Sequence, residues 1–153
     1  MGRRYRMNFA GISVSATQDL LAIYTGTKAI EIHEVIIGQI SGTTVQNLRV
    51  SHKTLSGTLT NGSGGSAGTI TPIIPTDTAA TVTGRVNDTS QASATTTVID
   101  REDVYNTINN YQYLPPREDR PNVGPSSIFV VSLDTSPTSA QTTNATIVFE
   151  ELF

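Results

Sequence analysis

Lys-Ala-Ile-Glu-Ile-His-Glu-Val-Ile-Ile-Gly-Gln, residues 28–39, is the stretch of this chain that decides its fold. Isoleucine and valine are branched at Cβ, which stiffens χ1 and favours a pleated strand over a helix. In an extended chain one face carries Ile30, Ile32 and Ile36, and the other carries Ala29, Glu31, His33 and Val35. Glu34 interrupts the apolar face, and residues 35–37 are apolar on both faces. We therefore expect a strand with a bulge, or a passage into deeper burial, at this point.

Similar runs on either side of this stretch predict an all-β protein. The expected strands cover residues 4–10, 20–24, 28–39, 45–53, 79–86, 95–99, 128–133 and 145–153, with 128–133 the clearest buried strand after the central one. Long connections at 54–75 and 100–125 favour a jelly-roll-like β-sandwich of about eight strands over a barrel closed by short hairpins. Residues 1–153 are expected to form one such domain, since 153 residues is the size of a single domain.

The composition agrees with this fold and excludes several classes of function. The chain contains 24 Thr and 14 Ser, residues that suit strands and exposed connectors. It has no Cys, so neither disulfides nor thiolate metal sites are available. No apolar run approaches a membrane span or the core of a secretory signal. A net charge of −3 does not indicate nucleic acid as a partner.

Four segments outside the apolar runs need separate interpretation. Arg3-Arg4-Tyr5-Arg6 begins an alternating run, so residues 1–10 predict either an edge strand protected by charges or an arm that adds to a neighbour's sheet. Residues 61–68 are rich in glycine but lack the Lys followed by Ser or Thr of a phosphate-binding loop, which favours a projecting loop. The charged residues 100–103 are expected to begin a turn of helix, and the Pro-rich residues 114–121 an ordered or extended loop.

Residues with catalytic or metal-binding chemistry are few and poorly spaced. His33 and His52 could face each other across adjacent strands, with Glu31 or Glu34 beside them, but no His-x-His pair and no third His is present. The sequence therefore favours two half-exposed sheet histidines and no metal site. A Gly-x-Ser-x-Gly elbow is missing, and the acids lie mostly in expected loops or at the terminus. We predict no catalytic residues, no cofactor and no enzymatic activity.

The order of several short motifs resembles that of capsid decoration (cement) proteins of tailed phages. These motifs are Arg3-Arg4-Tyr5, Ala16-Thr-Gln-Asp-Leu20, a branched-apolar strand ending at Ile37-Gly-Gln39, a Gly/Ser loop before Thr-Pro (62–72), Arg85-Val-Asn-Asp-Thr89 and Gly124-Pro-Ser-Ser127. The resemblance implies a jelly-roll or related fold and a homo-oligomer, with a trimer favoured and a dimer possible. It also implies binding to the major capsid protein on the outer surface of the virion, with no direct contact to nucleic acid or membrane.

Arginine and tyrosine are enriched at protein interfaces, so these residue types in two polar segments, residues 3–6 and residues 111–120, are the expected capsid contacts. They are Arg3, Arg4, Tyr5, Arg6, Tyr111, Tyr113, Arg117 and Arg120. If residues 1–8 form an arm, their deletion should lower capsid occupancy and leave the fold intact. Two alternatives remain: a carbohydrate- or receptor-binding module of a fibre or tail, against which the absence of Trp counts, and another structural component of the head or tail.

Overall fold

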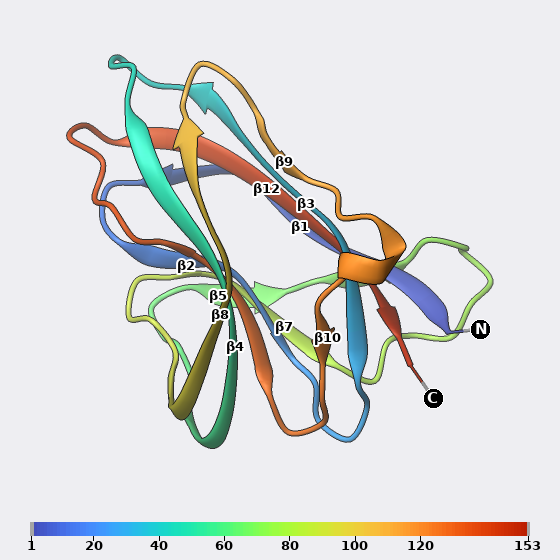
Figure 1. Ribbon diagram of the computed structural model, residues 1–153. Helices are drawn as coiled ribbons and strands as arrows, with labels where there is room; N and C mark the ends of the chain where they lie inside the picture. The colour runs from blue at the N-terminus through green and yellow to red at the C-terminus, as the bar shows by residue number, and fades with distance from the viewer. Residues whose placement is uncertain (1, 153) are drawn as a thin grey trace.

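The computed structural model describes residues 2–152 as two antiparallel sheets that pack face to face (Figure 1). In the order of pairing, sheet A contains β10 (Asn122–Val123), β3 (Ile30–Ser41), β12 (Gln141–Glu151), β1 (Arg3–Val14) and β6 (Ile70–Pro72), with β9 (Tyr111–Tyr113) also paired to β3. Sheet B contains β5 (Ser66–Gly68), β7 (Thr83–Asp88), β2 (Gln18–Tyr24), β11 (Ile128–Leu133), β4 (Asn47–Thr60) and β8 (Ser93–Asn106). The helical structure among these residues is one 3₁₀ turn, η1 (Arg117–Asp119).

The strand order is that of a jelly roll. When β5, β6, β7 and β10 are set aside, eight strands remain: β1, β2, β3, β4, β8, β9, β11 and β12. If these eight are renumbered from one to eight along the chain, their order is 1-8-3-6 in sheet A and 2-7-4-5 in sheet B. Every pairing among them is antiparallel, and two Greek keys of this kind define the jelly-roll sandwich. The predicted fold class is therefore confirmed, and β5 to β7 form an addition between β4 and β8 that extends an edge of each sheet.

The central stretch forms β3, and the bulge expected near Glu34 is present. Ile32 pairs with Phe149 and Glu34 with Val148 of β12, which leaves His33 without an opposite residue. One extra residue reverses the alternation of faces along a strand. Val35 and Ile37 consequently face the core, so the predicted inward position of Ile36 is wrong.

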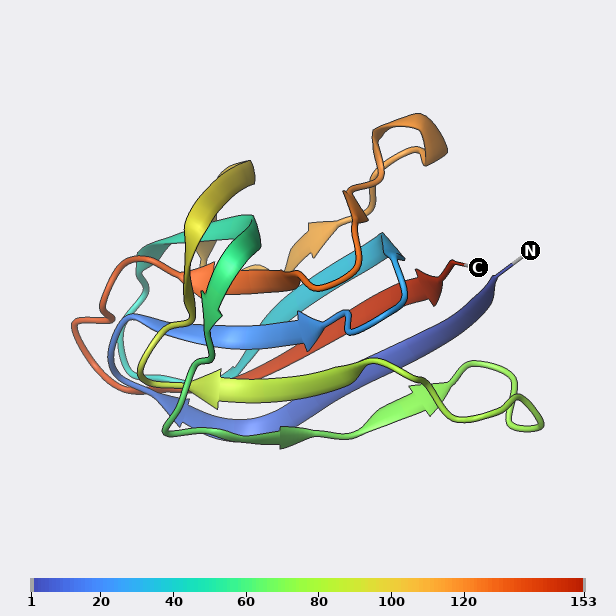
Figure 2. The same cartoon turned by 90° about the horizontal axis from the view of Figure 1, so that it is seen from below.

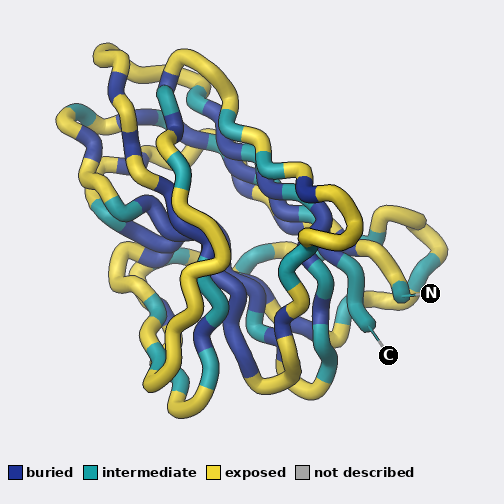
Figure 3. Tube along the Cα trace, viewed as in Figure 1, coloured by how far each residue is buried: buried dark blue, intermediate teal, exposed yellow. Residues whose placement is uncertain are grey.

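The core lies between the two sheets and includes one strand that is buried on both faces. All six residues of β11 are buried (Figure 3), as predicted for 128–133. Phe129 and Val131 join the main cluster between the sheets, whereas Ile128 and Val130 join a second cluster on the other face of sheet B. Because β11 lies between β2 and β4 and is covered on both faces, its residues are apolar, with the exception of Ser132.

The N-terminal segment is an integral strand. β1 pairs with β12 from Arg3, opposite Glu151, to Val14, opposite Gln141, and β6 covers its other edge at residues 5–7. The two ends of the chain consequently lie close together at the same end of the sandwich (Figure 1). Neither a free arm nor an unpaired edge strand describes residues 3–7, because alternate side chains there are buried in the core.

Both segments expected to be long loops contain strands, which make up most of residues 54–75 and just under half of residues 100–125. β4 continues through residues 54–60. Residues 100–106 continue β8 rather than starting a helix, because residues 101–106 pair with residues 47–52 of β4. Charged side chains suit β8, since it is an edge strand of sheet B and most of its residues are exposed. The three-residue strand β9 then pairs with the outer edge of β3.

The glycine-rich segment packs closely against β7 and does not project. The Gly65 amide donates to Asp88 Oδ1 at 3.0 Å, and Ser66 pairs with Val86 at the start of β5. A Cβ atom on Gly65 would overlap the carbonyl oxygen of Val86, so only glycine permits this approach. After β5 the chain crosses at Thr69 from sheet B to sheet A, where β6 runs beside β1 (Figure 2).

Candidate functional site

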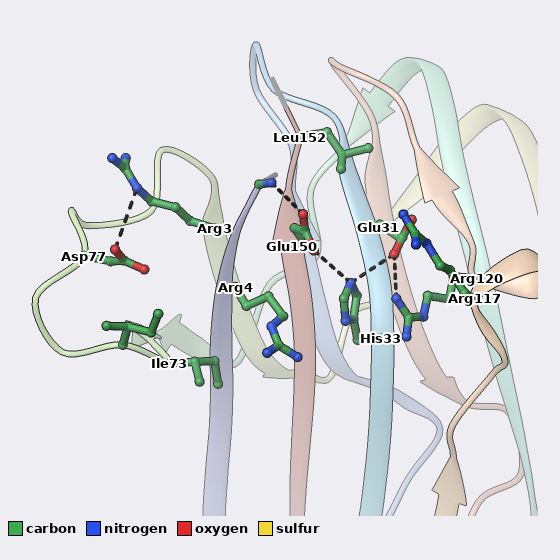
Figure 4. A pocket seen from close by; sticks show the side chains of 12 residues that line it. Arg3, Arg4, Glu31, His33, Ile73, Asp77, Arg117, Arg120, Glu150 and Leu152 are labelled. Atoms are coloured by element: carbon green, nitrogen blue, oxygen red, sulfur yellow. Dashed lines mark hydrogen bonds and ion pairs between the residues drawn. The ribbon is translucent and has the colours of Figure 1, made fainter.

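A hollow of about 650 Å³ lies on sheet A where the ends of the chain meet the loop that contains η1 (Figure 4). It is lined by Gly2, Arg3, Arg4, Glu31, His33, Ile73, Ile74, Asp77, Arg117, Arg120, Glu150 and Leu152. We call the four arginines of this set, Arg3, Arg4, Arg117 and Arg120, the arginine rim. The rim joins residues of β1 to residues of the η1 loop, so it unites the two polar segments in which the sequence predicted partner contacts.

Strand register explains how the floor of the hollow is built. Glu150 of β12 lies opposite both Arg4 of β1 and Glu31 of β3, so the three side chains form a row across neighbouring strands. The next row, which includes Tyr5, Phe149 and Ile32, is buried in the core. The row of charged residues therefore lies on the outer face of sheet A, where His33 joins Glu31 because the two residues are two positions apart on one strand.

The imidazole of His33 lies between the two glutamates of the floor. Its Nε2 atom is 3.0 Å from Glu31 Oε1 and 3.4 Å from Glu150 Oε2. Each carboxylate also has a second partner: Arg120 Nη1 donates to Glu31 Oε1 at 3.0 Å, and the Gly2 amide donates to Glu150 Oε1 at 2.7 Å. Burial lowers the pKa of His33 below its ordinary value and Arg120 acts in the same direction, although Glu31 and Glu150 oppose the shift.

The arginine rim contains both ion-paired and exposed guanidinium groups. Arg3 lies 3.9 Å from Asp77 and remains more than half exposed, while Arg120 is largely covered and tied to Glu31. Arg4 and Arg117 are exposed, and no ion pair to either is found within residues 2–152. A hollow with an anionic floor and an exposed guanidinium rim can bind a cation at its base and acidic groups of a protein at its margin.

The other predicted contact residues lie elsewhere. Arg6 is exposed on β1 but does not line the hollow. The Tyr111 hydroxyl donates to Asp103 of β8 at 3.0 Å and lies 3.3 Å from His52 Nε2. The Tyr113 ring packs against His52 with 4.8 Å between ring centroids and lies 5.1 Å from the Arg101 guanidinium. Both tyrosines thus bridge β9 to β4 and β8, and they are half-buried.

Tyr5 is a core residue. It is 1% exposed, its ring stacks on Phe149 at a centroid distance of 5.8 Å, and its hydroxyl donates to the Thr78 carbonyl at 3.1 Å. Met7, two positions further on, is fully buried as well. Deletion of residues 1–8 would therefore remove part of the core, which contradicts the expectation that it leaves the fold intact.

The two histidines do not form a pair. His33 belongs to sheet A and His52 to sheet B, and each is at most 8% exposed, so the expected pair of half-exposed histidines on adjacent strands is wrong. His52 packs edge-on against Phe129 and both tyrosines of β9. The grouping of Glu31 and His33 with Glu150 was missed because it depends on the register between β12 and β3. The period-two spacing of Glu31 and His33 was the available signal.

Comparisons with known proteins add no further assignment. The chain matches no protein-family model, no curated protein and no solved structure. No helix in residues 2–152 has the length and apolar character needed to cross a membrane. The site thus defines a class only: a jelly-roll sandwich with a charged hollow at the end where its termini meet.

Proposed function

We propose that this chain is a structural virion protein that decorates the outside of a phage capsid and binds the major capsid protein through the arginine rim. The observation that carries the proposal is the convergence of Arg3 and Arg4 with Arg117 and Arg120 on one hollow, although the two pairs are far apart in the sequence. Guanidinium groups form paired hydrogen bonds with carboxylates, which suits acidic segments exposed on an assembled shell. The order of motifs described above supports the same role.

The physical demands of a cement protein agree with this architecture. Such a protein holds subunits together by many contacts of modest strength, because each exposed ion pair contributes only about 0.2–1 kcal/mol. Contacts made simultaneously on a fixed lattice strengthen one another through high effective concentration. Assembly as a homo-oligomer, with a trimer favoured and a dimer possible, would present one arginine rim per protomer and so allow several contacts at once. The protein acts without a cofactor or catalytic residue in this proposal.

Of the alternatives, carbohydrate binding gains little support from the site. Sugar-binding modules stack exposed aromatic rings on the sugar, and Trp is absent here. Tyr111 and Tyr113 direct their rings toward His52, so little of their surface is available for stacking. The arginine rim, in contrast, is accessible to a protein partner, because Arg4 and Arg117 are exposed.

The proposal is tested by adding the purified protein to capsids that lack it and measuring occupancy after sedimentation. The variant Arg4→Glu/Arg117→Glu should bind about tenfold more weakly, since two favourable contacts are replaced by repulsion. Arg49→Glu is the matched control, because Arg49 is exposed on β4 in the other sheet, and should bind normally. Unchanged occupancy of the double variant, or an equal loss with the control, would reject the rim as the contact surface.

A further inference from the structure

Glu31, His33 and Glu150 bring three potential ligand atoms to one point in the floor of the hollow (Figure 4). One carboxylate oxygen of each glutamate and one ring nitrogen of His33 all lie within 4.8 Å of one another. Glu31 and Glu150 lie opposite each other in the ladder between β3 and β12, and His33 lies at the bulge two positions after Glu31. A site on paired strands holds its ligands more precisely than a site on loops.

The environment of His33 Nε2 favours a ligand between these three side chains. His33 is 8% exposed, and Nε2 itself is shielded from solvent. The atom lies near both carboxylates, yet it has no hydrogen-bond partner within residues 2–152. A buried polar atom without a partner is destabilising by about 1–3 kcal/mol and is rare in native proteins. A ligand that accepts the imidazole lone pair and both carboxylates would satisfy all three groups.

We propose that Glu31, His33 and Glu150 form a binding site for a divalent transition-metal ion, with Zn²⁺ as the best match. Zinc binds histidine nitrogen and carboxylate oxygen at about 2.0–2.2 Å with tetrahedral geometry, which places neighbouring ligand atoms about 3.3 Å apart. The distances from His33 Nε2 to Glu31 Oε1 and Glu150 Oε2 are 3.0 and 3.4 Å. Ca²⁺ and Mg²⁺ fit less well, because they prefer ligand sets made only of oxygen.

The surroundings resemble the outer shell of a metal site. The Gly2 amide holds Glu150 Oε1 and leaves Oε2 directed at His33. Arg120 Nη1 donates to Glu31 Oε1, the oxygen nearest His33, and so holds this carboxylate in position. Outer-shell hydrogen bonds of this kind orient ligands and support affinity. Because the four arginines of the rim surround Glu31 and Glu150, binding of a cation here depends on direct coordination by the cluster and not on the net charge of the hollow.

The open side of the cluster also favours metal binding. Three protein ligands leave a fourth tetrahedral position, which faces the hollow and is open to a water molecule. The site differs from the histidine pair considered in the sequence, because His52 takes no part in it.

The direct test is calorimetric titration of ZnCl₂ into full-length protein dialysed against a chelator, repeated with CoCl₂ while visible absorption is recorded. We expect one Zn²⁺ per chain and the intense visible bands of Co²⁺ in a site of low coordination number. With Zn²⁺ at about a hundredfold above Kd, the Tm should rise by about 5–10 °C. Absence of saturable binding by both ions would overturn the proposal.

Variants separate this site from adventitious binding elsewhere. His33→Gln and Glu150→Gln should each weaken Zn²⁺ binding by more than about 100-fold, beyond the 10–100-fold that loss of an outer-shell partner causes. Glu34→Gln is the matched control: it removes the same charge from β3, but Glu34 contacts Gln112 outside the cluster, and Zn²⁺ binding should be unchanged. Circular dichroism establishes that each variant is folded, and Glu150→Gln provides the test if His33→Gln disturbs the bulge. Equal affinity in the wild type and Glu150→Gln would overturn the site, whatever the outcome with capsids.

Discussion

Of the two histidines, His52 is the more deeply buried. It is fully buried, and three aromatic rings, those of Phe129, Tyr111 and Tyr113, meet it edge-on. Burial lowers the pKa of His52 to about 4, and Asp103 only partly offsets the shift. The folded protein therefore holds His52 neutral at pH values where the unfolded chain, with an ordinary histidine pKa of about 6.5, is already protonated.

This difference in pKa between the folded and unfolded states predicts that the protein is less stable in acid. Above about pH 6.5 neither state binds the proton, so the stability is unaffected; as the pH falls from 6.5 toward 4, protonation of the unfolded chain removes stability. At pH 4.5 the loss due to His52 should be about 2–3 kcal/mol. Urea denaturation at pH 7 and pH 4.5 measures it, with His52→Phe as the reference that fills the space without titrating. If the wild type and His52→Phe lose equal stability, His52 is not responsible.

At the scale of the element, β1 provides the clearest prediction. Tyr5 and Met7 are both buried, and removal of large core side chains costs about 2–5 kcal/mol each, against a total stability of about 5–15 kcal/mol for a typical domain. A chain that lacks residues 1–8 also loses most of the pairing between β1 and β12. We expect this truncated chain to show no cooperative thermal transition by circular dichroism.

The control keeps the strand and removes its charges. Arg3, Arg4 and Arg6 are exposed, and the full-length variant with all three changed to Gln should melt within a few degrees of the wild type. A truncated chain that melts like the wild type would show that β1 contributes little to the core. With this control, capsid binding can be tested on a folded protein, which the deletion does not allow.

Elements with strong local patterns were predictable from the sequence. Branched apolar residues identified β3 and β11, and the interruption at Glu34 identified the bulge. β8 was only partly predictable, because an exposed edge strand needs no apolar alternation and its charged residues 100–103 suggested a helix. β5, β6 and β9 have three residues each, too few for any periodic signal, and they are strands because of their partners.

The candidate site was predictable only in its parts. The arginines of both polar segments were identified by residue type, but their meeting at one hollow depends on the fold of the whole chain. Tyr5, Tyr111 and Tyr113 were assigned to an interface because tyrosine suits both interfaces and cores, and the sequence does not separate the two roles. Glu150 was overlooked, since its position opposite Glu31 follows from long-range register.

At the scale of the whole molecule, the two edges of the sandwich differ. At one edge β5 and β6 continue from sheet B into sheet A through Thr69 (Figure 2). At the other edge β8 pairs only with β4 within residues 2–152, and Val98, Ile99 and Val104 are exposed along it. An unpaired strand edge is a place where a strand of another chain can add. The proposed homo-oligomer has a suitable contact there.

The pairing of Arg3 with Glu151 also has a mechanical consequence. A force that draws the two ends of the chain apart peels β1 from β12 one hydrogen bond after another, whereas a force along the strands must break many bonds together. Because the chain has no cysteine, engineered thiols give unique attachment points. In optical tweezers, Arg3→Cys/Leu152→Cys should unfold at a lower force than Arg3→Cys/Ala140→Cys, which loads β1 and β12 in shear; equal forces would contradict this. In the proposed role on a capsid, the protein would resist expansion of the shell best when the load runs along β1 and β12, and less well when it is applied to the two ends of the chain.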